Sequence, residues 1–214
     1  MRQVMNRLTL EQACDELATR ENHFADLLER FGYPPLWARA GGFATMVMII
    51  LEQQVSLASA RAVYDRLLKH AGRISAERIA RMTAAELAAC GLTRQKSAYC
   101  KALAQRVVTK EISFARIGRS DEPSARQQLL DIKGVGAWSA DVYLLFASGR
   151  ADIWPIGDVA LIRSVFEVFN LDSLPDDSEC LERAENWRPW RSAAARMLWH
   201  AYLSRRGRQH VTAE

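Results

Sequence analysis

The sequence predicts an all-α fold, and three observations lead to that class. Apolar residues recur at the three- and four-residue spacing of a helix along nearly the whole chain, and no segment shows sustained alternation of apolar and polar residues. Capping residues and helix breakers separate these segments. With 214 residues, 49% of them hydrophobic, the chain is expected to form one domain or two tightly packed lobes.

The expected helices follow one another through short connections. Pro34-Pro35 ends the first, because proline lacks the amide that continues a helix. Gly91 ends a later one, at a position where a left-handed residue is favourable. Capping boxes are expected at Thr83 with Glu86 and at Asp176 with Glu179. The expected helices are residues 10–30, 43–54, 57–70, 76–81, 84–89, 94–110, 122–132, 137–148, 158–170, 178–186 and 190–205.

The composition disfavours membrane, secreted and metal-cluster proteins. The longest apolar stretch, Met46–Leu51, is far shorter than the roughly 20 residues that span a bilayer, and no apolar run follows the two arginines near the start. The cysteines fit neither a disulfide framework nor the close pairs of a zinc or iron–sulfur site. We therefore expect reduced, mostly buried thiols in a cytoplasmic protein. The cysteines are Cys14, Cys90, Cys100 and Cys180.

Positive charge is concentrated in two blocks. Residues 56–119 carry 13 Lys and Arg against 4 Asp and Glu, and residues 182–208 carry 7 against 2. Such blocks are typical of a surface that binds a polyanion, although arginines scattered on solvated helix faces give similar counts.

The segment Leu129–Ala140 predicts a tight helical hairpin. One helix ends near Ile132, the turn Gly134-Val135-Gly136 follows, and a second helix starts near Ala137. The free amides of the second helix form a ready site for a phosphate, which binds DNA without reading its sequence. A plain antiparallel helix pair with a glycine turn is the alternative.

The continuation of this segment carries a resemblance. Twenty residues after Trp138 comes Asp158, within the segment Asp152-Ile153-Trp154-Pro155-Ile156-Gly157-Asp158. The hairpin, the Gly/Pro-containing loop and this aspartate together resemble the helix-hairpin-helix DNA glycosylase superfamily. Upstream Ile50–Ser56, downstream Trp187–Ser192 and Trp199 make the chain most similar to its alkyl-base branch, the 3-methyladenine DNA glycosylase II family. The resemblance covers residues 34–204.

The resemblance implies two packed helical lobes with the hairpin at the cleft between them. One lobe is expected mainly from residues 42–118, the hairpin and catalytic loop from 122–160, and the other lobe from 1–41 and 161–214. Because the segment before Pro34 is short, we expect the compact form without the extra N-terminal domain of larger members. Trp138 stands where bifunctional members carry a nucleophilic lysine, so we expect no lyase activity. Lys133, in place of the usual proline, is expected on the phosphate side.

Asp158 is the one carboxylate expected to act in catalysis. Its alternative role is a helix N-cap, for which aspartate is among the best residues. An alkylated, cationic base leaves without being protonated, so a single carboxylate that stabilises the oxocarbenium-like sugar and orients water suffices. Glu52 and Asp141 are the nearest rivals.

Aromatic residues are expected to line the base pocket. Trp138 and Trp199 match positions in the family that face the catalytic cleft, where stacking and cation–π attraction select an electron-poor flipped base. Tyr143, Trp154 and Trp37 are further candidates for the pocket wall. Core packing is the alternative for each ring, most plausibly for Trp187 and Trp190.

The resemblance implies two further features of DNA binding. Gln54 matches the wedge that fills the gap left by the flipped base, with Gln53 as the less favoured neighbour and a solvent-facing loop glutamine as the alternative. Hairpin residues Lys133, Gly134, Val135, Gly136 and Ala137 are expected to contact phosphate. No cofactor is expected to be required, but main-chain carbonyls of Leu130, Ile132 and Val135 are expected to hold a structural Na⁺ or K⁺.

The leading hypothesis is therefore a monomeric, monofunctional glycosylase that removes alkylated purines from double-stranded DNA. A non-catalytic hairpin module that only binds damaged DNA would explain the hairpin and the charge equally well, but would not need Asp158 and the aromatic set. A glycosylase for mismatched or oxidised bases is the third hypothesis.

Overall fold

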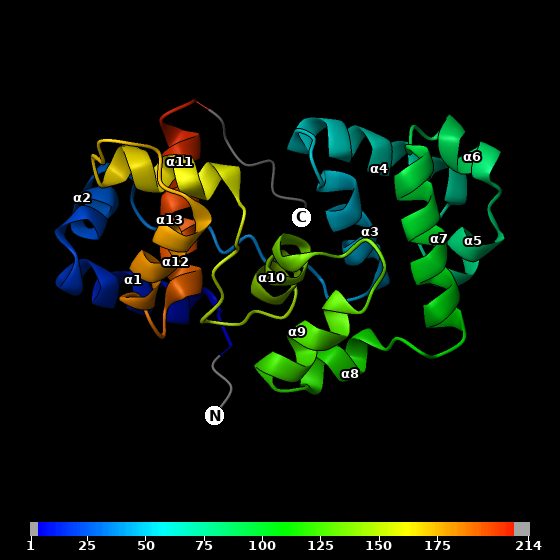
Figure 1. Ribbon diagram of the computed structural model, residues 1–214, viewed down its shortest axis with the longest axis horizontal. Coiled ribbons are helices and arrows are strands. Elements are labelled where there is room, and N and C mark those ends of the chain that lie inside the picture. The colour runs from blue at the N-terminus through cyan, green and yellow to red at the C-terminus, as the bar shows by residue number, and fades with distance from the viewer. Residues whose placement is uncertain (1–3, 208–214) are drawn as a thin grey trace. The chain divides into compact units, whose positions relative to one another are not determined.

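The all-α prediction is confirmed. The computed structural model describes residues 4–207, and within this range it contains thirteen α-helices and no strand (Figure 1). The described chain divides into two units. Unit 1 comprises the described residues up to Arg39 and from Leu144 onward, and unit 2 comprises Ala40–Tyr143. Residues 1–3 and 208–214, at the ends of the lobe expected from 1–41 and 161–214, lie outside the described residues.

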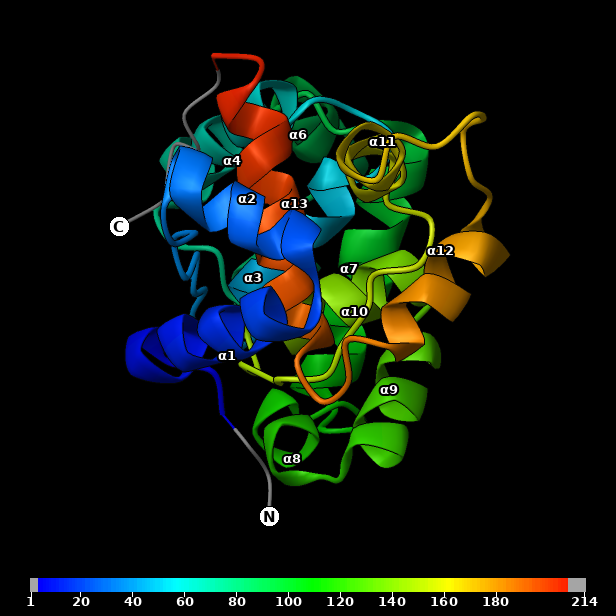
Figure 2. The same cartoon turned by 90° about the vertical axis from the view of Figure 1, so that its left-hand side faces the viewer.

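Unit 1 is organised around its last helix. It contains α1 (Arg7–Arg20), α2 (Asn22–Phe31), α11 (Val159–Val168), α12 (Asp177–Glu185) and α13 (Arg191–Ser204). Helix α13 packs against the other four, and Figure 2 shows it among α1, α2 and α11. Every residue of α13 from Arg191 to Trp199 is buried. This helix therefore forms the core of the unit.

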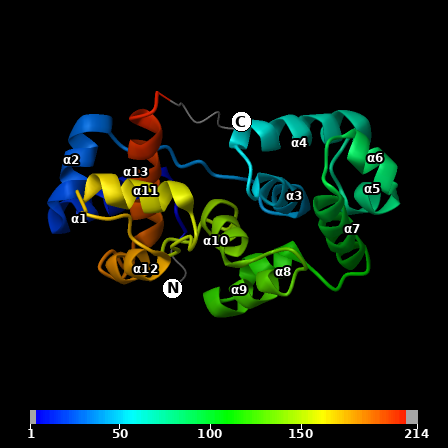
Figure 3. The ribbon, with the colours of Figure 1, turned by 45° about the horizontal axis from the view of Figure 1, so that its top comes forward.

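Unit 2 holds the remaining helices. They are α3 (Phe43–Glu52), α4 (Leu57–Ala71), α5 (Ala76–Arg81), α6 (Ala84–Ala89), α7 (Arg94–Val108), α8 (Phe114–Arg119), α9 (Glu122–Leu130) and most of α10 (Ala137–Phe146). Helix α7 packs against α3, α5 and α6, and α8 packs against α9. Figure 3 shows α7 beside α5 and α6. The apolar α3 supplies the buried core residues Met46, Val47, Ile49, Ile50 and Leu51.

Local capping chemistry explains many helix starts. The side chains of Ser56, Ser75, Thr93, Ser113 and Asp121 each accept a hydrogen bond from a first-turn amide. Both expected capping boxes are present, at Thr83 with Glu86 and at Asp176 with Glu179. Gly91 has φ +93°, which confirms the expected left-handed helix end.

Two elements differ from the expected helices. The expected helix 10–30 is interrupted at Glu21, whose extended backbone separates α1 from α2 and lets both helices pack against α13. Helix α8 was not expected; Gly118 lies inside it, and glycine is unfavourable within a helix.

The four cysteines are buried and free, as expected. Within residues 4–207 no helix combines the length and apolarity that crossing a membrane requires.

Candidate functional site

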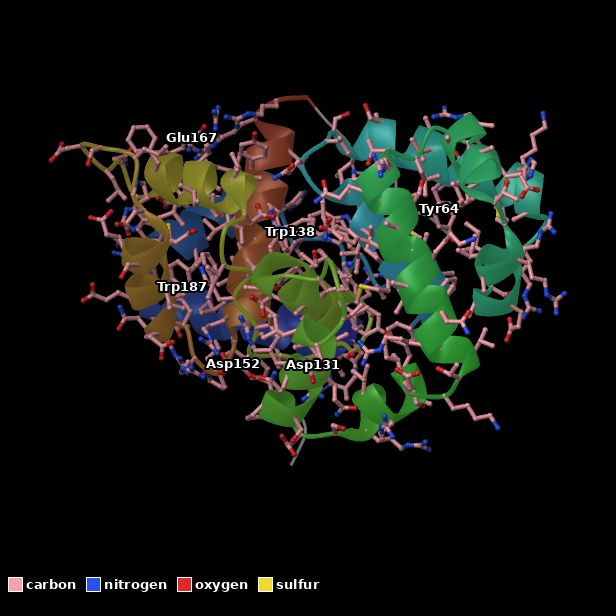
Figure 4. The ribbon with its side chains drawn as sticks, turned by 45° about the vertical axis from the view of Figure 1, so that its right-hand side comes forward. Tyr64, Asp131, Trp138, Asp152, Glu167 and Trp187 are labelled. Atoms are coloured by element: carbon pink, nitrogen blue, oxygen red, sulfur yellow. The ribbon has the colours of Figure 1, made fainter. Side chains whose placement is uncertain are left out.

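The hairpin predicted from Leu129–Ala140 is present in unit 2. Helix α9 ends at Leu130, and the amide of Val135 donates to the carbonyl of Ile132 at 2.9 Å to close the turn. Val135 is 5% exposed, so its side chain is buried. Figure 4 labels Asp131 and Trp138, which flank the turn on either side. Helix α10 therefore starts directly after the turn, and its first-turn amides follow Gly136 in the chain.

The two glycines of the turn have different environments. Gly134 has φ +85°, and a Cβ atom there would lie 2.3 Å from Cδ2 of Tyr99. Gly136 has no heavy atom within 4 Å of the position that a Cβ would occupy. Gly134 is therefore required for the turn itself, whereas Gly136 leaves open space beside the start of α10.

An ion pair between a half-buried arginine and a buried carboxylate joins the two helices of the hairpin. Arg126 on α9 pairs with Asp141 on α10, and the Asp141 side chain is completely buried. Removal of one partner from such a pair leaves an uncompensated buried charge, which is strongly unfavourable. Asp141 therefore belongs to the hairpin scaffold, which accounts for it without a catalytic role.

The turn after α3 contains the two glutamines expected at the DNA. Gln54 is exposed and has φ +57°, a left-handed conformation that is uncommon outside glycine. The side-chain amide of Gln53 donates to the carbonyl of Gly134 at 2.8 Å and to the hydroxyl of Ser139 at 2.9 Å. Gln53 is thus bonded to the hairpin, and Gln54 is the more accessible of the two.

The other expected site residues of unit 2 differ in accessibility. Lys133 and Gly136 are exposed, whereas Trp138, Gly134 and Ala137 are half-buried. Tyr143 is 2% exposed and its hydroxyl accepts a hydrogen bond from the Gly42 amide at 2.8 Å. Burial raises the pKa of Tyr143 to about 12. Of the two rings proposed for the pocket in this unit, Trp138 is the accessible one.

Asp158 caps α11 in unit 1. Its Oδ1 accepts a hydrogen bond from the Leu161 amide at 2.9 Å, so the capping role considered from the sequence is present. The same oxygen accepts a second bond, from Nε1 of Trp199 at 3.1 Å. The carboxylate is half-buried. Two donors therefore fix its orientation while part of the group remains accessible.

The loop before Asp158 is anchored on both sides. The Ile153 amide donates to Oγ of Ser192 at 3.0 Å, where both residues are buried. The Gly157 amide donates to Oδ1 of Asp177 at 3.0 Å. Asp152, labelled in Figure 4, pairs with Arg191 at 2.8 Å. The loop that presents Asp158 is therefore held by the starts of α13 and α12.

The tryptophans of unit 1 are mainly packed. Trp199 is 7% exposed and stacks on Phe146 with ring centroids 5.3 Å apart. Trp154 is 5% exposed and makes an edge contact with Trp187, which is labelled in Figure 4. Trp37 is half-buried, with φ +48°. These placements favour packing for Trp154 and a contact with Asp158 for Trp199.

Three residues on α7 that contact the Gln54 turn or the hairpin turn were not expected from the sequence. Nζ of Lys96 donates to the carbonyls of Leu51 and Gln53, and the Tyr99 ring lies against Gly134. Arg106 donates to the Asp131 carbonyl at 2.7 Å. The signal was their spacing of three and seven residues, which places them on one helix face.

A comparison with known families identifies the chain. Residues 47–189 match the family described as "HhH-GPD superfamily base excision DNA repair protein". The chain belongs to this family. The match to the HhH-GPD superfamily includes the hairpin, the Gln54 turn and Asp158, and it excludes Trp37 and Trp199.

Similar proteins share the fold over most of the chain. The DNA-3-methyladenine glycosylase of Bacillus subtilis is 33% identical over 123 residues, which are 58% of this chain and 41% of that protein. The chain therefore spans less than half the length of this curated relative. The structure of the Schizosaccharomyces pombe 3-methyladenine DNA glycosylase in complex with abasic DNA has a TM-score of 0.83 at 24% identity, covering 88% of this chain and 95% of that one.

The same fold occurs in a protein that is named for another activity. An 8-oxoguanine glycosylase/lyase from Clostridium acetobutylicum, in complex with double-stranded DNA, has a TM-score of 0.74 at 13% identity and covers 92% of this chain and 70% of that one. Neither membership of the HhH-GPD superfamily nor the fold therefore identifies the lesion that is removed or whether a lyase step follows. Both depend on individual side chains.

Proposed function

We propose that this protein is a DNA-3-methyladenine glycosylase of type II, which hydrolytically removes alkylated, cationic purines from duplex DNA and leaves an abasic site. The observation that carries the proposal is Asp158, a half-buried carboxylate whose Oδ1 is held by the Leu161 amide and Trp199 Nε1. Asp158 and the hairpin both lie in the segment that matches the base-excision superfamily.

The chemistry needs only one carboxylate. The bond between C1′ of the sugar and the ring nitrogen breaks with its electron pair going to the base, which leaves neutral because it was already a cation. Asp158 stabilises the positive charge that develops on the sugar. It also orients the water whose oxygen bonds to C1′, and the water's proton passes to solvent. Because the base is already cationic before the bond breaks, no general acid is needed to protonate it.

Unit 2 provides the groups that hold and open the duplex. Exposed Lys133 and the first amides of α10, beside the open space at Gly136, receive a phosphate. Exposed Gln54 enters the stack in place of the extruded base. Half-buried Trp138 stacks on that base and attracts its positive charge.

We also propose that the hairpin holds a structural Na⁺ or K⁺. Oxygen ligands from backbone carbonyls suit such an ion, and the turn is already shaped by the bond from Val135 to Ile132 and by Arg106 on the Asp131 carbonyl. Carbonyls of Leu130, Ile132 and Val135 would hold the ion, and its positive charge would favour a DNA phosphate at the hairpin. A carbonyl oxygen has two lone pairs, so the Ile132 carbonyl can serve both partners.

We further propose a monofunctional, monomeric enzyme that acts in the cytoplasm and associates with the nucleoid through DNA. Trp138 provides no amine at the position from which bifunctional members form a Schiff base. The free, buried cysteines are compatible with a reducing compartment.

The deciding experiment is incubation of the protein with alkylated duplex DNA and chromatographic identification of the released bases. We expect 3-methyladenine and 7-methylguanine in solution, strands that stay uncut until heated in alkali, and no covalent complex after borohydride treatment. Binding without base release would favour the non-catalytic hairpin module. A trapped covalent complex would exclude the monofunctional mechanism.

A further inference from the structure

Gln54 is held in a conformation that its own side chain does not explain. A non-glycine residue at φ +57° is strained, and such strain persists only where the surroundings over-determine the backbone. Gln54 is exposed, so burial of its side chain is not the source. The restraint must come from its neighbours.

Lys96 supplies that restraint from α7. Its Nζ donates to the carbonyl of Leu51 at 2.7 Å and to the carbonyl of Gln53 at 2.9 Å. These carbonyls lie at the end of α3, where main-chain acceptors lack helical partners. The ammonium is half-buried, and burial lowers the pKa of Lys96. One cation thus holds the backbone immediately before Gln54.

The same turn is bonded to the hairpin. Gln53 reaches the Gly134 carbonyl and the Ser139 hydroxyl with its side-chain amide. On the far side of the hairpin turn, Arg106 holds the Asp131 carbonyl. Lys96 and Arg106 are both on α7, so this helix contacts the Gln54 turn and the hairpin turn at once.

We propose that Lys96 is a positioning residue for the wedge: it fixes the Gln54 turn against the hairpin, so that a duplex held by the hairpin meets Gln54 at a set distance. The inference rests on the proposed function in that Gln54 is taken as the wedge. It assigns Lys96 no phosphate contact, because its ammonium is bonded to two carbonyls of its own chain.

The test compares Lys96→Met with Lys101→Met. Lys101 is also on α7 and also donates to a backbone carbonyl, that of Met82, which belongs to neither turn. Binding is measured to a duplex with a tetrahydrofuran abasic analogue and to the same duplex undamaged. We expect Lys96→Met, which removes both hydrogen bonds, to reduce the preference for the abasic duplex by about tenfold. Lys101→Met should keep the preference of the wild type.

A second readout follows the wedge itself. With 2-aminopurine opposite the abasic analogue, wild type and Lys101→Met should give the same fluorescence change on binding, and Lys96→Met a smaller one. Gln53→Ala breaks the link without removing a charge and should reproduce the Lys96→Met result. If Lys96→Met proves unfolded by circular dichroism, Gln53→Ala decides the question alone.

Equal loss of affinity for both duplexes, with a salt dependence reduced by about one phosphate contact, would mean that Lys96 binds DNA directly and would overturn the proposal. An unchanged preference in both variants would overturn it as well. Because the analogue carries no base to excise, these results do not depend on glycosylase activity. A wild-type protein that prefers the abasic duplex but releases no base would contradict only the proposed function.

Discussion

Helix α13 of unit 1 and helix α7 of unit 2 each hold part of the candidate functional site, and they do so with different bonds. From α13, Trp199 donates to the carboxylate of Asp158, and Arg191 pairs with the carboxylate of Asp152. From α7, Lys96 and Arg106 donate to backbone carbonyls. Helix α13 therefore orients two carboxylates in addition to the main chain of its loop, which Ser192 bonds at Ile153, whereas Lys96 and Arg106 of α7 contact main chain alone in these turns.

This difference matches two kinds of task. A carboxylate that acts on a developing cation must be fixed as a charge, and neutral or cationic donors can fix it without removing that charge. A turn that receives a phosphate must present amides, and cations behind its carbonyls leave those amides available and favour an anion in front. We therefore expect substitutions in unit 1 to change the rate of base release, and substitutions in unit 2 to change DNA binding.

The largest effect should come from Asp158→Asn. Asparagine keeps the capping ability but removes the charge that opposes the cationic transition state, so base release should fall by about a hundredfold to a thousandfold. Affinity for undamaged DNA should remain near that of the wild type. Single-turnover release of 7-methylguanine measures the rate. The control is Asp176→Asn, which changes the cap of α12 in the same unit; equal rates in the two variants would contradict the catalytic assignment.

The two glycines of the hairpin sharpen the comparison within unit 2. Gly134→Ala places a Cβ against the Tyr99 ring at a positive φ, so the free energy of unfolding should fall by at least about 1–3 kcal/mol. Gly136→Ala meets no neighbour, so thermal unfolding should be unchanged while the added methyl group weakens DNA binding. Differential scanning calorimetry and a binding titration separate the two effects. Gly136→Ala with unchanged DNA affinity would place the phosphate elsewhere.

These glycines also show what sequence reasoning could reach. The hairpin, the capping boxes and the cap at Asp158 depend on residues within a few positions of one another, and their spacing is legible in the sequence. That Gly134 must pack on a ring depends on Tyr99, 35 positions earlier. The sequence pattern therefore assigned both glycines to the turn, whereas the structure gives them different environments.

The long-range bonds of the site were beyond the same reasoning. Lys96 reaches carbonyls 43 and 45 positions away, and Trp199 reaches a carboxylate 41 positions away. Backbone carbonyls leave no trace in residue identity, so Lys96 appeared only as one charge of a basic block. The stacking role expected for Trp199 came from the family resemblance, whereas its hydrogen bond to Asp158 is visible only in the folded structure.

Trp199→Phe tests whether α13 acts through the carboxylate. The ring is kept but its N–H is lost, and a hydrogen bond to a charged acceptor contributes about 1.5–3 kcal/mol. We expect kcat for 3-methyladenine release to fall by about tenfold while KM changes little, if part of that bond is expressed in the transition state. Trp190→Phe is a matched control, because Trp190 is also 7% exposed and donates to a carboxylate, that of Glu16.

A drop in kcat for Trp199→Phe alone would support positioning of Asp158 by α13. Equal losses in both variants would instead indicate a general effect of removing a buried donor. A rise in KM specific to cationic bases would instead support the expected role of Trp199 in the base pocket, since the loss of cation–π attraction weakens substrate binding.

The smallest effect is expected for Lys133→Gln, which tests the phosphate side of unit 2. Lys133 is exposed at the hairpin turn, so its charge contributes to DNA binding by releasing counterions. Affinity should fall only severalfold at moderate salt, and the slope of log affinity against log salt should decrease by about one phosphate contact, equally for damaged and undamaged duplexes. Lys69→Gln, in the last turn of α4, removes the same charge away from the hairpin and should leave the slope nearer that of the wild type. Base release at saturating enzyme should be unchanged, because the charge acts before the chemical step. If Lys133→Gln leaves the salt slope at its wild-type value, the lysine does not face a phosphate, and the hairpin of unit 2 binds DNA through its amides alone.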